Sequence, residues 1–169
     1  MKTIIRFDGD YRFLSNFYKA EITYDGIKYP TTENAYQAAK SLDTNERQTI
    51  ANLDKPVDAK RAGKKVTLRN GWDGIKDGIM LDVLKIKFTA HPDLAKKLID
   101  TEDSVLIEGN FWHDTHFGVC YCDKCMGIGE NKLGELLMKV RDELKSSKVT
   151  NITSGMDVDR SDLLDIPEI

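Results

Sequence analysis

The side chains that could do chemistry in this sequence fall in three short stretches, each of which mixes polar and aromatic residues. The first is RFLSNFY (Arg12–Tyr18), the second is YPTTENAYQAAK (Tyr29–Lys40) and the third is GNFWHD (Gly109–Asp114). An ordinary structural element does not require such a mixture. We therefore expect the three stretches to line one pocket.

Two of these stretches supply a carboxyl group, Glu33 and Asp114. Hydrolysis of a glycosidic bond passes through an oxocarbenium-like sugar, so it needs a carboxylate near the anomeric carbon and a second group that helps the leaving group to depart. Glu33 and Asp114 fit these needs by residue type. Each also has a structural alternative, because Glu33 would favour the helix dipole in a first turn and Asp114 is a common turn residue.

Lys40 is predicted to share a helix face with Glu33, since Glu33, Gln37 and Lys40 follow the i, i+4, i+7 spacing. Its amine could bind a phosphate, or attack the anomeric carbon and form a Schiff base. A solvated lysine on the helix surface is the structural alternative.

Two tryptophans and a glycine-rich segment are further binding candidates. Trp72 and Trp112 could stack on a nucleobase, with a place in the core as the alternative for each. Gly127–Asn131, which includes Gly129 and Asn131, precedes a predicted helix whose first turn could present amides to an anion.

The three cysteines lie within six residues, at Cys120, Cys122 and Cys125, and their odd number argues against a disulfide framework. The favoured interpretation is three reduced thiols. A structural zinc site with His116 is the alternative, because Cys-x-x-Cys spacing suits zinc, and a redox role is the third.

Short strands are predicted near the beginning of the chain and again late. Glu21–Tyr24 and Ile27–Tyr29 flank Asp25-Gly26, a pair typical of a tight hairpin. Thr3–Phe7 and Ser104–Glu108 are also predicted as strands, the second because its apolar residues are β-branched or Leu.

Helices are predicted for most of the remaining chain. Pro30 ends the hairpin, and Thr31 or Thr32 can cap a helix that runs to about Ser41. Further helices are predicted at Glu46–Leu53, Val57–Lys65 and Gly74–Phe88. A short helix that ends at Ile99 follows His91-Pro92, and a final helix that ends at about Leu144 follows Gly127–Asn131. The predicted fold is α+β, a mostly helical single domain of residues 1–145 around a small antiparallel sheet, followed by a polar, acidic and mobile tail at 146–169.

The composition limits the partners. With 25 Lys plus Arg against 28 Asp plus Glu, the net charge of -3 offers no general field for nucleic acid, although a local basic pocket for phosphate remains open. No window reaches the roughly 18 apolar residues of a membrane helix, and the start turns polar too early for a secretory signal. We expect a cytoplasmic protein without a membrane partner.

The same stretches resemble the YbiA-like family, also called NADAR. The matching residues are SNFY (Ser15–Tyr18), YDGxxYPTTENxYQxxK (Tyr24–Lys40), RNGW (Arg69–Trp72), NFWHD (Asn110–Asp114) and GIGENKLGELLMKVR (Gly127–Arg141). They occur in a consistent order from about Phe7 to Leu144, which is more specific than any single motif.

The resemblance implies an α+β fold and N-glycosidase activity. Two kinds of substrate are associated with the family: phosphoribosylated pyrimidine intermediates of riboflavin synthesis, and ADP-ribose attached to a base, notably guanine in nucleic acid. By position, the resemblance implies functional roles for Glu33, Lys40, Trp72 and Asp114. The expected partner is therefore a phosphoribosyl or ADP-ribosyl small molecule, or modified nucleic acid, and no pattern indicates an oligomeric state.

The resulting hypothesis assigns phosphate and ribose hydroxyls to Arg12, Asn16 and the Gly127–Asn131 segment, and the base to the tryptophans. No cofactor is expected. The rival is a non-catalytic module that binds ADP-ribose or a nucleotide in the same pocket. Two departures bear on substrate preference: many relatives have His in place of Asn34 and Gly in place of His113.

Overall fold

The first hairpin is the one that Asp25-Gly26 predicts. In the computed structural model, which describes residues 2–154, β2 (Ile22–Tyr24) and β3 (Ile27–Tyr29) pair antiparallel. Asp25 and Gly26 have φ values of 46° and 78°, as a two-residue turn between twisted strands requires. The hairpin prediction is confirmed.

Two other sheets have only two short strands each. β1 (Thr3–Ile4) pairs with β4 (Val105–Leu106), and β5 (Gly109–Asn110) pairs with β6 (Val119–Cys120). Both pairs are parallel. The predicted α+β class is confirmed, but two of these three sheets are not antiparallel, because parallel partners come from distant segments that no local turn signal reveals.

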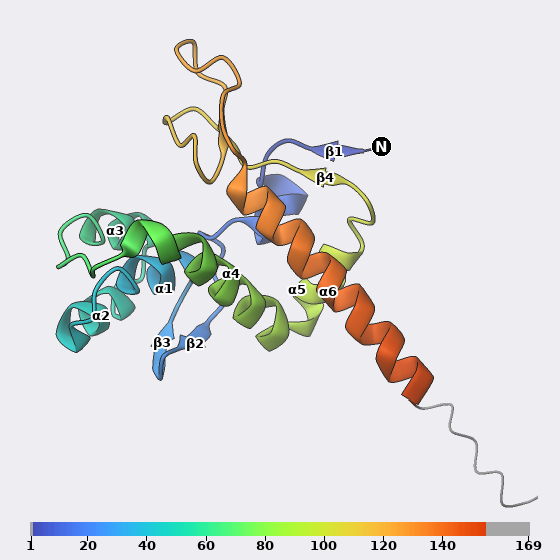
Figure 1. The fold of residues 1–169 in the computed structure, drawn as a ribbon, viewed down its shortest axis with the longest axis horizontal. Coiled ribbons are helices and arrows are strands. Elements are labelled where there is room, and N and C mark those ends of the chain that lie inside the picture. The colour runs from blue at the N-terminus through green and yellow to red at the C-terminus, as the bar shows by residue number, and fades with distance from the viewer. Residues whose placement is uncertain (1, 155–169) are drawn as a thin grey trace, which may run out of the picture.

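Helices make up most of the described chain (Figure 1). They are a 3-10 helix η1 (Gly9–Leu14), α1 (Thr32–Ala38), α2 (Thr44–Ala51), α3 (Pro56–Ala62), α4 (Trp72–Ala90), α5 (Pro92–Ile99) and α6 (Lys132–Ser154). The Thr31 side chain caps α1 by accepting a hydrogen bond from the Asn34 amide. The last helix continues to Ser154, past the predicted start of the tail, and residues 155–169 lie outside the described part.

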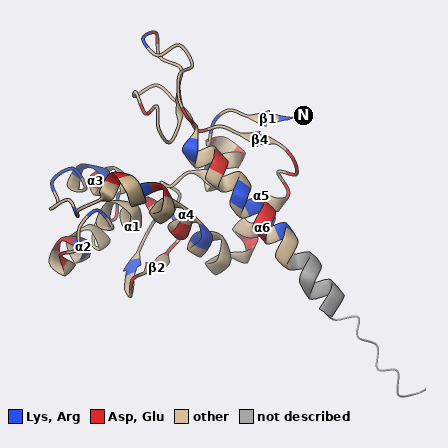
Figure 2. Cartoon of the chain, viewed as in Figure 1, with Lys and Arg blue, Asp and Glu red and all other residues tan. Residues whose placement is uncertain are grey.

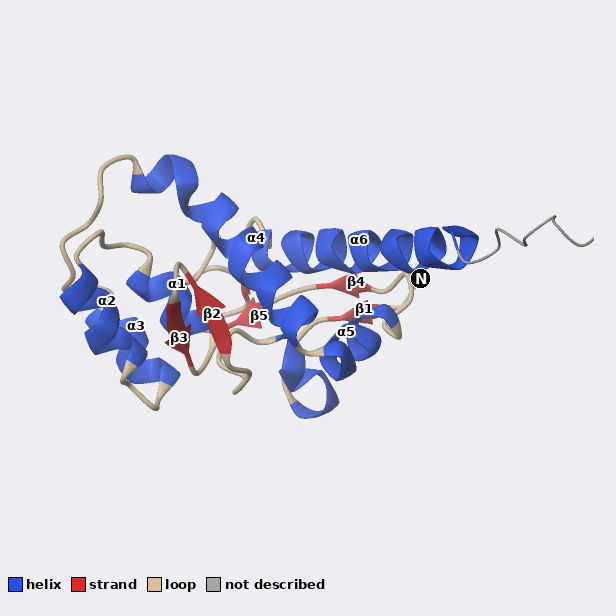
Figure 3. Ribbon diagram, turned by 90° about the horizontal axis from the view of Figure 1, so that it is seen from below, coloured by secondary structure: helices blue, strands red, loops and turns tan. Residues whose placement is uncertain are grey.

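The core forms around α1, every residue of which is buried. α2, α3 and α4 pack against it, and α6 packs against α4, α5 and β4. Figure 3 shows α6 running alongside β1 and β4. The apolar stripe predicted on α4 lies in this core: Ile79 and Val83 are buried, while Ile75 and Ile86 pack at its edge.

Charged residues of both signs are interspersed along the helices (Figure 2). Lys and Arg gather around α3 and the loop that follows it, where the sequence reads KRAGKK from Lys60 to Lys65. Within residues 2–154, none of the helices combines the length and the apolar composition that crossing a membrane requires. The segment after α3 is therefore the local basic feature that the overall charge leaves open.

Candidate active site

A cavity of about 490 Å³ brings the three polar and aromatic stretches together. Asn16 lines it from the segment after η1, Glu33 and Lys40 from α1 and the turn beyond it, and Trp112 and Asp114 from the loop after β5. This volume is typical of a pocket for a small ligand. Five of the predicted site residues thus meet at one place.

Glu33 is the most enclosed acid of the cavity. Its side chain is buried, and its Oε1 accepts a hydrogen bond of 2.8 Å from Gln37 Nε2, one turn further along α1. Burial raises the pKa of Glu33, while the Gln37 hydrogen bond and the positive charges of Lys60 and Lys40 lower it. Neighbouring groups therefore favour the carboxylate in an otherwise dry setting.

Gln37 is held in place by the close approach of α3. A Cβ on Gly63 would lie 2.0 Å from Gln37 Oε1 and 2.8 Å from Gln37 Cβ, so only glycine leaves room for this side chain. The amide then donates to Glu33 from a fixed direction. The sequence pattern predicted that Glu33 and Gln37 share a face, but it gave no sign of the contact with Gly63.

Glu108 is a cavity residue that the sequence interpretation missed. It follows β4 and lines the cavity, and its Oε2 is buried without a hydrogen-bond partner in the described part of the chain. Burial, helped by the charge of Asp114, raises the pKa of Glu108 to about 7. Its position at the end of the predicted strand Ser104–Glu108, just before GNFWHD, was the available signal.

Asp114 has a structural and a cavity-facing part. Its Oδ1 accepts hydrogen bonds from the His116 and Phe117 amides, and its backbone is bonded to the buried Asn110 side chain. The carboxyl group nevertheless lines the cavity. Asp114 therefore has the turn role that the sequence gave as an alternative and also lies on the cavity wall, while its catalytic role stays a prediction.

Lysines gather on one side of the cavity. Helix α1 ends at Ala38 rather than near Ser41, yet Lys40 still lines the cavity, and Lys60 reaches it from α3. The pKa of Lys40 is lowered, chiefly by burial, with Glu33 opposing this and the charges of Lys60 and Lys64 adding to it. Lys40 and Lys60 on the cavity wall, with Lys64 close enough to lower the pKa of Lys40, form a cationic cluster suited to an anion.

The cavity wall includes Tyr36 and Phe117, and its exposed aromatic residues are Phe17 and Trp112. They are 37% and 59% exposed, and Lys60 Nζ lies 5.9 Å from the centroid of each ring. Trp72, by contrast, is buried, and its ring packs 5.3 Å from that of Tyr36, which itself lines the cavity. The predicted stacking role for Trp72 is thus corrected to a core role behind Tyr36, because its position at the start of α4 turns it inward.

Arg12 and the glycine-rich segment do not reach the cavity. Arg12 is exposed on η1 and is absent from the cavity wall. The Asn131 side chain instead ties the Glu108 amide to the Leu106 carbonyl, and a Cβ on Gly129 would clash with the Gly118 carbonyl. Both residues are structural.

The amides at the start of α6 are already satisfied. The N–H groups of residues 130–133 donate to carbonyls of residues 115–118. The predicted anion site at this helix end is therefore corrected, because carbonyls of the preceding loop already occupy the amides of residues 130–133.

The two departures from the family pattern have different positions. Asn34 is buried and donates to the Ile50 and Leu53 carbonyls, so it joins α1 to the end of α2 and does not line the cavity. His113 lies beside the three cysteines, whereas His116, the predicted fourth member, contacts Asp77 and Glu130. The histidine of this cluster is thus His113, since the loop turns between the two positions.

Known proteins are similar to this chain in sequence and in fold. The NADAR domain model matches residues 6–145. N-glycosidase YbiA of Escherichia coli K12 is 36% identical over 151 residues, which cover 86% of this chain and 91% of that protein. A riboflavin biosynthesis protein of Vibrio vulnificus is 30% identical over 89% of this chain and 40% of its own length.

A solved structure agrees with both matches. The NMR structure of E. coli YbiA superposes with a TM-score of 0.74 at 34% identity, covering 88% of this chain and 89% of that one. The enzyme class expected from the sequence, N-glycosidase, is also the one in the name of the YbiA relative. The chain therefore belongs to the NADAR family.

Proposed function

We propose that this N-glycosidase releases a base from a phosphorylated ribose or from ADP-ribose, in the cavity that contains Glu33. The observation that carries the proposal is the meeting of two buried carboxyl groups, Glu33 and Glu108, with the amines of Lys40 and Lys60. Acids suit the glycosidic centre, and amines suit a phosphate beside it.

The exposed aromatic rings give the base its place. Phe17 and Trp112 present their faces at the cavity, and stacking on such rings accepts any base. The cationic cluster of Lys40, Lys60 and Lys64 then takes the phosphate in place of Arg12 and the start of α6. A phosphoribosyl pyrimidine and an ADP-ribosylated guanine both contain a base, a ribose and a phosphate.

The reaction breaks the bond between C1′ and the base nitrogen, and a water oxygen forms the new bond to C1′. Glu33 faces the positive charge that develops on the ribose, and Asp114 accepts a proton from the attacking water. Glu108 donates a proton to the departing base nitrogen, because a carboxyl group with a pKa of about 7 still holds one near neutral pH.

Lys40 has a second possible role, as a nucleophile. Burial lowers the pKa of its amine, which favours the neutral form that attacks C1′. The base would then leave and the opened sugar would remain on Lys40 as an imine until water releases it. A hydrolytic path through Glu33 and Asp114 forms no such imine.

Product release tests the function. The chain is incubated with a phosphoribosyl pyrimidine and with ADP-ribosylated guanosine, and the released pyrimidine or guanosine is measured by chromatography, with Glu33→Gln as the matched inactive variant. We expect release from at least one substrate and little from the variant. Tight binding of both compounds with no release would instead establish a binding module.

Borohydride distinguishes the two roles of Lys40. Reduction during turnover should fix the sugar on the peptide that contains Lys40, as added mass in a digest, and Lys40→Arg should abolish the adduct. An active preparation that remains unmodified would restrict Lys40 to phosphate binding.

A further inference from the structure

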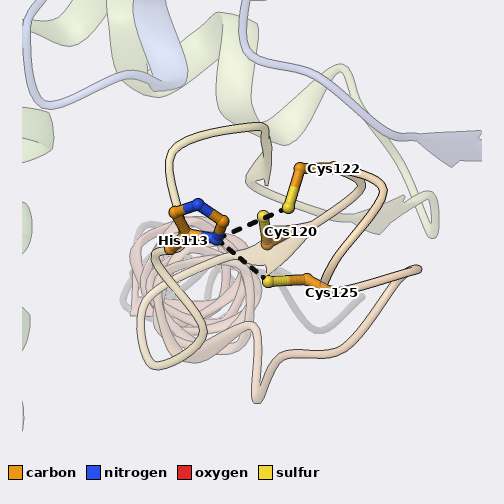
Figure 4. Close-up of side chains that lie close together, drawn as sticks. All are labelled: His113, Cys120, Cys122 and Cys125. Atoms are coloured by element: carbon orange, nitrogen blue, oxygen red, sulfur yellow. Dashed lines mark hydrogen bonds between the residues drawn. The ribbon is translucent and has the colours of Figure 1, made fainter.

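Outside the cavity, four ligand-type side chains converge at one point of the loop between β5 and α6 (Figure 4). They are His113, Cys120, Cys122 and Cys125, and their ligand atoms all lie within 4.8 Å of one another. His113 Nδ1 lies 3.3 Å from Cys125 Sγ and 3.4 Å from Cys122 Sγ. The proposed glycosidase chemistry uses none of these groups.

We propose that these four side chains bind one zinc ion, which fixes the loop that carries Trp112 and Asp114 into the cavity. Zinc holds cysteine sulfur at about 2.3 Å and histidine nitrogen at about 2.0–2.1 Å, so tetrahedral ligand atoms lie roughly 3.5–3.8 Å apart. The observed spacing needs only small adjustments to reach this geometry. A Cys3His set is also a common structural zinc site, and Cys122 and Cys125 have the usual Cys-x-x-Cys spacing.

The segment around these four side chains has little apolar packing of its own. Among residues 121–130, Cys122 and Cys125 are half-buried and every other residue is exposed, including Met126 at 81% and Ile128 at 62%. A loop without an apolar core of its own is the setting in which a metal ion contributes folding energy. The Lys124 and Cys125 amides already interact with the Cys122 sulfur, a second layer that metal thiolates commonly have.

The backbone at His113 fits the same role. Its φ of 66° lies in the left-handed region, which is unfavourable for a residue with a side chain. A histidine at this position becomes useful when its ring binds something, and the ring lies against the three thiols. Zinc would exchange for three thiol protons, with neutral His113 as the fourth ligand and no change of oxidation state.

Metal analysis of the full chain tests the proposal. Protein purified under reducing conditions and desalted should contain one zinc per chain by mass spectrometry of the metal. Changing a residue that only hydrogen-bonds a metal ligand lowers metal affinity by roughly 10–100-fold, and removing a ligand should lower it at least as much. His113→Ala and Cys125→Ser should therefore lose zinc to a chromogenic chelator. His116→Ala is the matched control, and it should retain zinc.

Two measurements on the unmodified chain remain decisive if a variant fails to fold. Cobalt(II) in place of zinc should give the intense visible bands of tetrahedral thiolate coordination. Chelation should increase hydrogen exchange in residues 109–131 and leave α4 unchanged. The proposal is overturned if the reduced chain surrenders all its zinc to an equimolar chelator, if two of the thiols form a disulfide under these conditions, or if His116→Ala, and not His113→Ala, loses the metal.

Discussion

Replacing Glu108 by Gln tests whether this carboxyl group holds a proton near neutral pH. Its folded-state pKa is about 7, against an ordinary value of 4.5, because the group is buried and Asp114 is nearby. Between these two pH values the folded chain binds a proton here that the unfolded chain has lost. The free energy of unfolding therefore falls as the pH rises through this window.

The size of the effect follows from the shift. A rise from 4.5 to about 7 corresponds to about 3 kcal/mol in full, of which about 2–3 kcal/mol falls between pH 5 and pH 8. Gln has a similar shape and no charge. Relative to the unmodified chain, Glu108→Gln should therefore gain about 2–3 kcal/mol in stability from pH 5 to pH 8.

Urea unfolding at several pH values measures this difference. Glu21→Gln is the control, because it removes the same charge from an exposed position, where the ion pair with Lys28 contributes little to stability. Glu108→Gln should also reduce kcat by about 10²–10⁴-fold if the group donates the proton to the base. A stability difference that does not change with pH would refute the assignment of a raised pKa to Glu108.

Four further substitutions test the site and the core around it. Gly63→Ala should displace Gln37 and lower kcat more than it raises KM, since its Cβ would lie 2.0 Å from Gln37 Oε1; unchanged steady-state kinetics would show that Gln37 does not position the acid. Trp112→Ala should weaken substrate binding by about 1–3 kcal/mol in calorimetry without loss of stability. Trp72→Ala should instead lower the free energy of unfolding by about 3–5 kcal/mol. The reverse pattern would restore Trp72 as the stacking residue. Lys87→Met should destabilise the chain by about 1–3 kcal/mol in urea, because the buried amine donates to the Phe13 and Ser15 carbonyls, and a neutral result would mean that water replaces the lysine there.

The sequence alone determined the features that depend on neighbours a few residues apart. Asp25-Gly26 specifies the hairpin because its conformation is local, and Thr31 specifies the start of α1 because its side chain caps the next turn. The helical spacing placed Glu33 and Gln37 on one face, and the two are hydrogen-bonded. The order of the motifs along the chain was enough to indicate the family.

Only the tertiary structure decided which side chains meet across the chain. Lys60 enters the cavity because α3 packs against α1. Glu108 enters it from the segment just after β4, a strand that pairs with one about a hundred residues earlier. Trp72 and Trp112 were equivalent by composition, yet packing buries the first and exposes the second. His113, whose φ is 66°, meets the cysteines, whereas His116 contacts Asp77 and Glu130. Residue type and spacing constrain contacts within a turn or two of helix, whereas a cavity wall depends on how distant segments pack, and no local pattern carries that information.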